Sequence, residues 1–357
     1  MDFTLSEELQ MIREMARDFV THELLPIESQ TLVLDGQPGK RGAPIPREKF
    51  ARLKTLAVEQ GLWAMTAPEA LGGGGLSTLG ACVVAEELGK TFVDFDFGDL
   101  PPLLFEANAE QRAKFLTPAI AGETQIALAA HEPASDEITA RATPAAADWV
   151  LNGAKLARAA DVYLVLARAD AGVTCFIVEN LGWQNGKLIL ENTRVPAPNV
   201  LGEIGGAFAL MKKSQPALWT RSAARQVGVA ARLLETSSQY ARDWKALGQP
   251  LAVRPAVQRH LADLAIEITA ARWLVYQAAI EIDEGKDARN AAARAYLFAT
   301  ELLQRATDRT IEIYGGPAHT AELPMLRIYA ADRKSHERIL EFQRFKLAQT
   351  LINADAR

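Results

Sequence analysis

Apolar residues at the start of the chain recur at helical intervals. Spacings of four, three, four and three residues separate Leu5, Leu9, Ile12, Ala16 and Phe19. This spacing places their side chains on one face of a helix, so the first twenty residues predict an amphipathic helix. Thr4 and Glu7 match a capping box, in which each side chain satisfies a free backbone amide of the first turn.

Helical spacing returns in two further regions. Near the N-terminus it covers residues 47–60, 77–90 and 109–120, and toward the C-terminus 206–246, 255–285 and 288–313. Glycine and proline interrupt these patterns. Long helical patterns joined by short connections predict that the C-terminal region is an antiparallel bundle.

Between residues 124 and 203 the pattern changes to short apolar runs. They read DWVLNG, DVYLVLARAD, GVTCFIVEN and GKLILENTRVP, and Gly, Asn and Asp separate them. Such runs predict β-strands joined by turns. We therefore expect an α+β multidomain protein with an N-terminal helical domain, a central antiparallel β-domain and a C-terminal helical bundle, at residues 1–122, 123–204 and 205–357.

Composition narrows the function classes. The chain has 357 residues, 49 % of them hydrophobic, and a net charge of −5. Without a basic block it lacks the electrostatic signature of nucleic-acid binding, and no apolar run is long enough for a membrane span. Cys82 and Cys175 are its two cysteines, neither in a CxxC pair, which argues against disulfides and zinc and fits a cytoplasmic protein.

Three short motifs carry candidate chemistry. GGGG at 72–75 has no following Lys, so it predicts a turn before a helix rather than a phosphate loop. IYGG at 313–316 predicts a glycine that ends a helix, or backbone amides that face a diphosphate. HEPASD at 131–136 contains His and Ser, but without a GxSxG motif it predicts a loop rather than a hydrolase site.

Glu337 is the remaining candidate, and its local sequence allows an ordinary explanation. Arg333 and Lys334 precede it by four and three residues, which is the spacing of ion pairs on a helix surface. By itself this spacing favours a solvated carboxylate.

Five segments, taken in order, resemble the acyl-CoA dehydrogenase family over nearly the whole chain. They read MDFTLSEELQMIREMARDF, APEALGGGGLS, EQRAKFLTPAIAGETQIALAAHEPASD, RVPAPNVLGEIGGAF and IEIYGGPAHTAELPMLRIY. The resemblance implies α,β-dehydrogenation of an acyl-CoA thioester in lipid metabolism, with FAD as cofactor. It further implies an electron-transferring flavoprotein as electron acceptor, and a homo- or hetero-oligomeric dimer or tetramer.

The resemblance also assigns roles to residues. The run ERILEFQR, from Glu337 to Arg344, aligns with the family's E-G-T-S-E-I-Q-R, which implies that Glu337 is the catalytic base. Some members carry the base on an earlier helix, where this chain has Thr220 before Arg221. The implied substrate-binding residues are Ser135 and Arg221, and the implied cofactor-binding residues are Leu128, Ala130, His131, Glu312, Gly315, Gly316, Thr320 and Ile339.

Several positions depart from the family pattern. The family's W-I-[ST]-N falls on Ala157–Ala160, and Trp244 replaces an Arg that reaches the cofactor diphosphate of a neighbouring subunit. Further departures are His131 for a Thr, Leu247 for a Phe, Ala318-His319 for Gly-Tyr, and Arg338 and Ile339 for Gly and Thr. Two hypotheses follow: an FAD enzyme with a rearranged pocket, or a weakly FAD-binding partner subunit of a heteromeric dehydrogenase. A hydrolase that uses His131 and Ser135 is a third, with little support.

Overall fold

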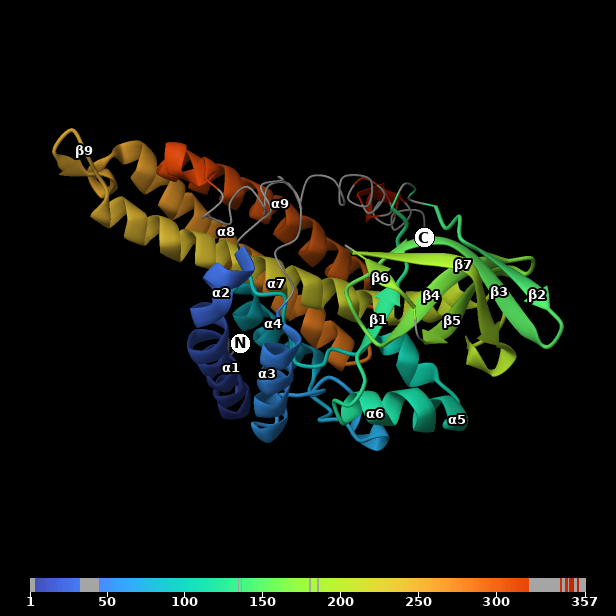
Figure 1. Cartoon of the computed structure of the whole chain (residues 1–357). Helices are drawn as coiled ribbons and strands as arrows, with labels where there is room; N and C mark the ends of the chain where they lie inside the picture. Colours follow the sequence, from blue (N-terminus) through green and yellow to red (C-terminus); the bar gives the residue numbers. More distant parts are fainter. Residues whose placement is uncertain are drawn as a thin grey trace. The chain divides into compact units, whose positions relative to one another are not determined.

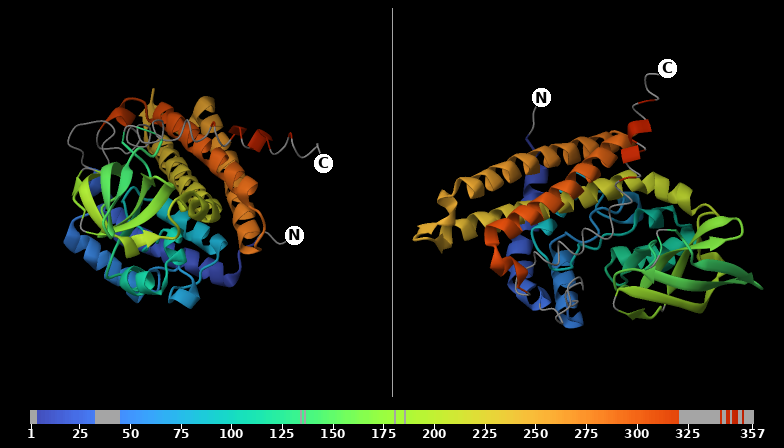
Figure 2. Two further views of the ribbon diagram at one scale, coloured as in Figure 1. Left: turned by 90° about the vertical axis from the view of Figure 1, so that its right-hand side faces the viewer. Right: turned by 90° about the horizontal axis from the view of Figure 1, so that it is seen from above.

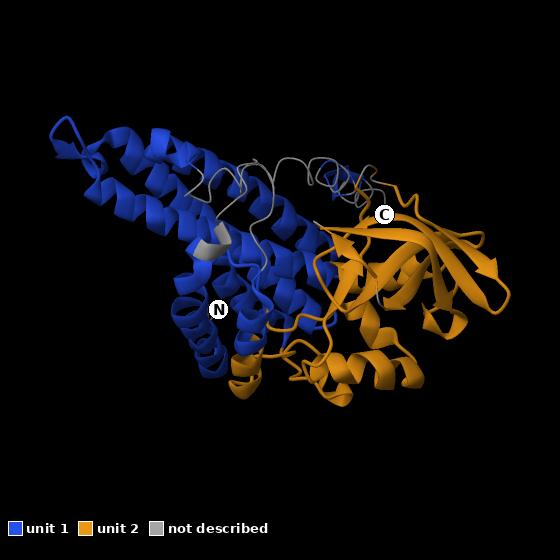
Figure 3. Ribbon diagram, in the orientation of Figure 1, with its two compact units in different colours: residues 1–53, 77–95, 216–357 blue, residues 54–76, 96–215 orange. Residues whose placement is uncertain are grey.

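The structure is a computed structural model. It describes residues 4–32, 45–133, 135, 137–179, 181–184, 186–320, 341, 344–345, 347–349 and 352. The chain divides into two compact units, one of residues 1–53, 77–95 and 216–357 and the other of residues 54–76 and 96–215 (Figure 3). The division into three domains at residues 122 and 204 stays a prediction.

The N-cap of the first helix, α1 (Glu7–Phe19), lies two residues later than the predicted cap. Ser6 is the N-cap, and its hydroxyl accepts a hydrogen bond from the Leu9 amide at 3.3 Å, so the predicted Thr4–Glu7 capping box is wrong. Glu7 instead lies in the first turn, where the helix dipole favours an acidic side chain. The predicted apolar face is confirmed at Ala16 and Phe19, which are buried.

Most of the remaining helices follow the predicted patterns closely, whereas the short helix over residues 25–32 was not predicted. After α1 come a π-helical turn (Val20–Leu24), α2 (Leu25–Leu32), α3 (Arg47–Glu59) and α4 (Thr78–Gly89), and later α7 (Ala207–Asp243), α8 (Pro255–Asp283) and α9 (Arg289–Tyr314). Between α7 and α8 lies a small hairpin of β9 (Lys245–Ala246) and β10 (Gln249–Pro250). Figures 1 and 2 show α8 and α9 lying side by side along their lengths.

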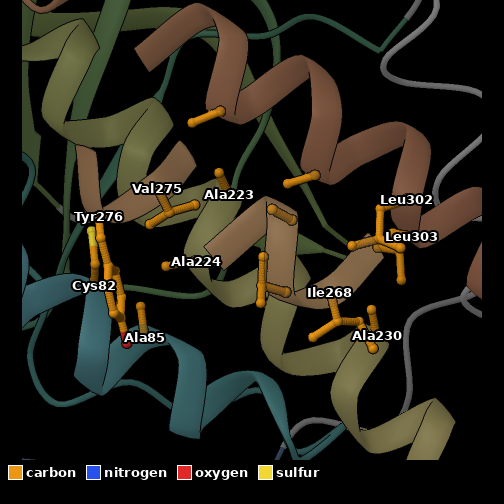
Figure 4. Packing of buried hydrophobic residues seen from close by; sticks show 14 of the residues in the cluster. Cys82, Ala85, Ala223, Ala224, Ala230, Ile268, Val275, Tyr276, Leu302 and Leu303 are labelled. Carbon is orange, nitrogen blue, oxygen red and sulfur yellow. The ribbon is translucent and has the colours of Figure 1, made fainter. Parts of the chain in front are cut away.

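Small side chains let α4 pack closely against the long C-terminal helices. The buried cluster there includes Cys82 and Ala85 of α4, Ala223 of α7 and Ile268 of α8 (Figure 4). A Cβ atom on Gly228 would lie 2.0 Å from the Glu86 carbonyl oxygen, far inside contact distance. Only glycine fits there, so α4 and α7 approach each other backbone to backbone.

The second unit contains one sheet of eight strands in the part of the chain that the structure describes. Its order is β6-β7-β3-β2-β4-β5-β8, and β1 pairs with β4 off this path. All pairings are antiparallel except β1–β4 and β2–β4. The strands are β1 (Ile126–Ala129), β2 (Arg141–Ala145), β3 (Asp148–Leu156), β4 (Val162–Ala169), β5 (Gly172–Glu179), β6 (Trp183–Gln184), β7 (Lys187–Pro196) and β8 (Val200–Leu201).

The two central strands explain the densest apolar run of the sequence. Nearly every residue of β4 and β5 is buried, because side chains pack on both faces of the sheet. One face packs against the segment that holds α5 (Ala109–Gln111) and α6 (Thr117–Ile120). The predicted α+β organisation, with helices before and after a mostly antiparallel sheet, is confirmed.

Candidate active site and cofactor site

The proposed base and one proposed cofactor contact fall outside the residues that the structure describes. Glu337 and Ile339 lie between residue 320 and residue 341, where the description of the chain is interrupted. Their assignment therefore stays a prediction from the sequence. The other proposed residues are described, and each can be placed on its element.

Leu128 lies on an edge strand of the sheet, and Ala130 follows directly after that strand. In the described part of the chain, β1 pairs with β4 alone. The amides of Asp161 and Val162 donate to the Gln125 carbonyl at 3.0 and 3.1 Å, so odd-numbered residues of this segment direct their backbone groups to β4. Because strand backbone groups alternate in direction, Leu128 directs its groups to the edge away from β4. The Ala130 carbonyl, one residue beyond β1, accepts a hydrogen bond from the buried Lys155 ammonium at 3.3 Å.

The loop after β1 is fixed by a buried ion pair. The Lys155 ammonium of β3 lies 3.0 Å from a Glu132 carboxylate oxygen, and both residues are buried. Glu132 also accepts hydrogen bonds from the amides of Thr139 and Ala140, each at 2.7 Å, and from the Thr139 hydroxyl. These contacts join the two ends of the loop that contains the predicted site residues His131 and Ser135.

The electrostatics of Glu132 favour its charged form. Burial acts to raise the pKa of this carboxyl, but the Ala140 amide, the Thr139 hydroxyl and Lys155 hold that pKa below its ordinary value. The sequence analysis missed this pair. A signal was present, because Lys155 is a charged residue within the alternating inward pattern of β3 that begins with Trp149 and Leu151.

The loop also constrains the two predicted residues themselves. His131 is exposed, and its carbonyl accepts from the Leu156 amide at 2.8 Å. The Ser135 hydroxyl accepts a hydrogen bond from the Glu137 amide at 3.0 Å, a local turn of the kind that the HEPASD motif predicts. The loop interpretation of that motif is therefore confirmed at Ser135.

The segment after β3 has few side-chain donors. Of Ala157–Ala160, only Arg158 has a polar side chain, and it pairs with Asp96. The Ala157 carbonyl accepts from the Trp183 indole at 2.8 Å, and the Ala160 amide donates to the Tyr163 hydroxyl at 3.0 Å. The hydroxyl that the family pattern would place at residue 159 is absent, while Trp183 supplies an aromatic ring from elsewhere in the chain.

The end of α9 presents open backbone. Gly315 has φ 62° and ψ −131°, a combination that glycine adopts readily, and its amide donates to the Ile311 carbonyl at 2.8 Å. A Cβ atom on Gly315 or Gly316 would meet no atom of the described residues within 4 Å, so among these residues nothing blocks the approach of a ligand to the backbone. The prediction that glycine ends this helix is confirmed.

The neighbours of these glycines have partners of their own. Glu312 pairs with the His260 ring at 2.9 Å. The Thr320 hydroxyl donates to the Pro317 carbonyl at 2.9 Å. Both side chains are largely exposed, and both would have to change partners to bind a cofactor directly.

Trp244 lies in a stack of three aromatic rings. Its ring stacks on Tyr240 with 5.5 Å between centroids, and Tyr240 stacks on Tyr314 at 4.1 Å. Leu247, at the hairpin tip, has φ 53° and is 93 % exposed. A stacked indole cannot make the two parallel hydrogen bonds that an Arg makes to a diphosphate.

Two adjacent residues of α7 have different environments. The Thr220 side chain is buried, and its hydroxyl donates to the Pro216 carbonyl at 2.8 Å. Arg221 is half-buried, and its charge partly opposes the rise that burial causes in the pKa of the Cys82 thiol. No carboxylate occupies either position, which agrees with the expectation that this helix does not supply the base.

The described residues fit a flavin through their backbone. A free strand edge offers alternating N–H and C=O groups, which complement the donors and acceptors along the rim of a planar heterocycle. Considered within their own unit, Gly315 and Gly316 also have backbone that is open toward the described residues. Among the residues that the structure describes, no group of three or more His, Cys, Asp or Glu could hold a metal ion. In the same residues no helix is long and apolar enough to cross a membrane.

Two family models match the chain at its ends. Residues 6–123 match the acyl-CoA dehydrogenase N-terminal domain. Residues 220–336 match the acyl-CoA dehydrogenase C-terminal domain. Together these matches cover most of the helical sequence before and after the strands of the sheet.

Characterised relatives match over nearly their full lengths. The chain is 31 % identical to (R)-benzylsuccinyl-CoA dehydrogenase of Thauera aromatica, with 99 % of this chain and 97 % of the relative covered. It is also 31 % identical to mitochondrial short-chain specific acyl-CoA dehydrogenase of Sus scrofa, with 98 % and 91 % covered. The solved structure of butyryl-CoA dehydrogenase from Megasphaera elsdenii is similar, with TM-score 0.82, 25 % identity and 99 % and 100 % covered.

Proposed function

This chain belongs to the acyl-CoA dehydrogenase family, and from that premise we propose that it catalyses the α,β-dehydrogenation of an acyl-CoA thioester with FAD as cofactor. The match of nearly the whole chain to acyl-CoA dehydrogenases carries the proposal. The free edge of β1 and the open glycines after α9 support it, because both offer backbone groups to a cofactor.

Glu337 is the general base in this proposal. Its carboxylate takes the proton from the α-carbon of the thioester, and bound FAD supplies the hydride acceptor for the β-carbon. A base of this kind works best when an apolar, substrate-covered site raises its pKa toward the working pH. Negative charge develops on the thioester oxygen as the proton leaves, so this oxygen needs hydrogen-bond donors.

Other residues position the two ligands. Leu128, Ala130 and His131 serve the flavin ring, and Gly315 and Gly316 serve the diphosphate through their backbone. Glu312, Thr320 and Ile339 complete the proposed cofactor contacts. Ser135 and Arg221 bind the acyl-CoA, with the Arg221 guanidinium suited to a phosphate or carbonyl oxygen.

A second function is a partner subunit of a heteromeric acyl-CoA dehydrogenase. Two observations favour it: Ala157–Ala160 lacks a hydroxyl donor, and Trp244 stands where a diphosphate-binding Arg is expected. In this case the chain binds FAD weakly alone and assembles with a homologue that completes the site. Dimers or tetramers, and an electron-transferring flavoprotein as acceptor, belong to both proposals.

Replacing the base tests the main proposal. In Glu337→Gln the flavin should stay bound, but its reduction by the acyl-CoA substrate should fall by several orders of magnitude, because an amide cannot take the proton. Flavin bleaching in anaerobic stopped-flow measurements reports the rate. Glu284→Gln is the matched control, because Glu284 is an exposed carboxylate that pairs with Lys286.

Each result separates the two functions. If the acyl-CoA substrate reduced the flavin of Glu337→Gln as fast as that of the native chain, Glu337 would not be the base. Flavin binding and reduction that occur only after co-expression with a homologous chain would favour the partner-subunit function over the stand-alone enzyme.

A further inference from the structure

The helical unit contains a cavity that the proposed dehydrogenation does not use. It is open to solvent on one side and has a volume of about 520 Å³ between α1, α4 and α8. Its apolar lining comes from Leu5, Val83, Trp273 and Tyr276. A volume of this size lies within the usual range for small-molecule sites.

The charged lining of the cavity is predominantly cationic. Four cations line it, namely Arg13, Arg17, Lys90 and Arg272, but only two carboxylates do, those of Glu86 and Glu87. Both carboxylates are buried residues. The lining therefore carries two more positive than negative charges.

The two carboxylates are fully occupied by three of the cations. Arg272 contacts Glu86 through two nitrogens, at 2.6 and 3.0 Å. Glu87 pairs with Arg17 at 3.0 Å and with Lys90 at 2.6 Å. These pairs hold three cationic side chains against the cavity wall.

Arg13 is the fourth cation of the lining, and it does not pair with Glu86 or Glu87. It forms no ion pair with any residue that the structure describes, and its Nε is buried without a hydrogen-bond partner. Buried polar groups normally have partners, and a guanidinium matches a carboxylate or phosphate with paired N–H groups. The four acids of α1, namely Glu7, Glu8, Glu14 and Asp18, are exposed and do not line the cavity.

Arg13 also lies close to the aromatic part of the lining. Burial raises the pKa of Tyr276 to about 12, and the charge of Arg13 is among those that oppose this rise. Trp273, from the same helix as Tyr276, adds an indole to the lining. A ligand that reaches Arg13 therefore meets two aromatic side chains as well.

We propose that this cavity binds a small organic anion, a carboxylate or phosphate joined to a planar apolar group. The anionic group pairs with Arg13 and shares the excess positive charge of Arg17, Lys90 and Arg272. The apolar group packs against Trp273 and Tyr276. The site uses no residue assigned above to the flavin or the thioester, so it is separate from the proposed catalytic function.

Calorimetric titration of the full chain in the presence of FAD tests the proposal. The probes are benzoate and phenyl phosphate, which represent the two anionic groups, and benzyl alcohol, which has the apolar group without charge. We expect saturable one-site binding of at least one anion and none of the alcohol. Arg13→Gln should weaken anion binding at least tenfold, and Arg13→Lys should weaken it less.

Arg232→Gln is the matched control, because Arg232 is also a helical arginine with a buried, unpartnered Nε but lies outside the cavity lining. It should leave anion binding unchanged. Thermal unfolding verifies that each variant is folded. If Arg13→Gln does not fold, the anion affinity of Arg13→Lys tests the proposal instead. The absence of saturable binding, equal binding of benzyl alcohol, or unchanged affinity in the Arg13 variants would overturn the proposal without affecting the proposed dehydrogenation.

Discussion

Two neighbouring sites at the C-terminal end of β3 differ in their polar groups. Lys155, near the C-terminal end of β3, forms a buried and fully partnered pair with Glu132. Immediately after that strand, Ala157–Ala160 offers three alanines and one arginine, Arg158, that pairs with Asp96. The first arrangement holds a loop in place, whereas the second provides no hydroxyl for a cofactor.

The buried pair should affect the stability of the fold, whereas the missing hydroxyl should affect only the binding of a cofactor. A buried charge without its partner destabilises the folded state, whereas water solvates the same charge in the unfolded chain, so loss of either Glu132 or Lys155 alone should weaken the fold strongly. A missing hydroxyl weakens one ligand contact only, by the modest amount of a single hydrogen bond. The buried pair therefore fixes the loop after β1, and our proposal is that FAD binding relies mainly on backbone groups.

The largest expected effect comes from breaking the buried pair. Lys155→Met leaves the Glu132 carboxylate buried without its cation, so the free energy of unfolding should fall by about 3–5 kcal/mol. Urea denaturation followed by circular dichroism measures this change. The double variant Glu132→Gln/Lys155→Met should recover part of the loss, because it removes both charges.

An exposed pair of the same unit provides the control for that variant. Lys114 and Glu179 form an ion pair whose side chains are 55 % and 36 % exposed. Lys114→Met should change the free energy of unfolding by no more than about 1 kcal/mol. Equal losses in Lys114→Met and Lys155→Met would contradict the structural role of the buried pair.

Acid should weaken the same pair. The pKa of Glu132 is lower in the folded chain than its ordinary value of about 4.3. The stability that this carboxylate contributes is therefore complete above that value and is lost as the pH falls through the lowered pKa. Unfolding free energies measured from pH 7 to pH 3 should fall more steeply for the native chain than for Glu132→Gln. Parallel curves would show that Glu132 does not contribute.

Adding a hydroxyl group to the segment Ala157–Ala160 should strengthen FAD binding. Ala159→Thr adds the donor that the family pattern places there, and one hydrogen bond contributes about 0.5–1.5 kcal/mol, a gain of roughly two- to tenfold in FAD affinity. Flavin fluorescence quenching measures the affinity. Ala147→Thr, at an exposed turn between β2 and β3, is the control and should change nothing. Unchanged affinity in Ala159→Thr would place the flavin away from this segment.

The smallest expected effect on stability comes from breaking the ion pair between Arg158 and Asp96. Asp96 retains hydrogen bonds from the Gly98 and Asp99 amides without Arg158. Arg158→Gln should therefore lower the free energy of unfolding by no more than about 1 kcal/mol, as for other partly exposed pairs. If Arg158→Gln lowered the free energy of unfolding as much as Lys155→Met does, the two ion pairs would contribute equally to stability, which would contradict the difference proposed here.

The sequence predicts the elements better than it predicts their polar contacts. Apolar periodicity located the long helices and the four longest strands, because burial imposes that periodicity directly. It did not reveal β1 and β2, whose runs are short and rich in alanine, and it misplaced the first helix cap, since Thr4 and Ser6 are chemically similar. The Glu132–Lys155 pair joins residues that are 23 positions apart, which no local spacing indicates.

The proposed site could be predicted only through family resemblance. Local spacing around Glu337 indicated a surface carboxylate, and the aligned motif reversed that interpretation. The role of Glu337 and of Ile339 stays a prediction, since both lie outside the described residues. The aromatic stack of Tyr240, Trp244 and Tyr314 depends on packing between α7 and α9 and has no signature in the sequence.

FAD binding by the purified full-length chain is the most direct test of the account. After incubation with FAD and removal of free cofactor, the visible absorption spectrum should show a bound oxidised flavin, with about one FAD per chain. The binding should be saturable and should survive in Ala147→Thr. A chain that shows no flavin absorbance, even after co-expression with a homologous acyl-CoA dehydrogenase, would contradict the claim that this family member uses FAD.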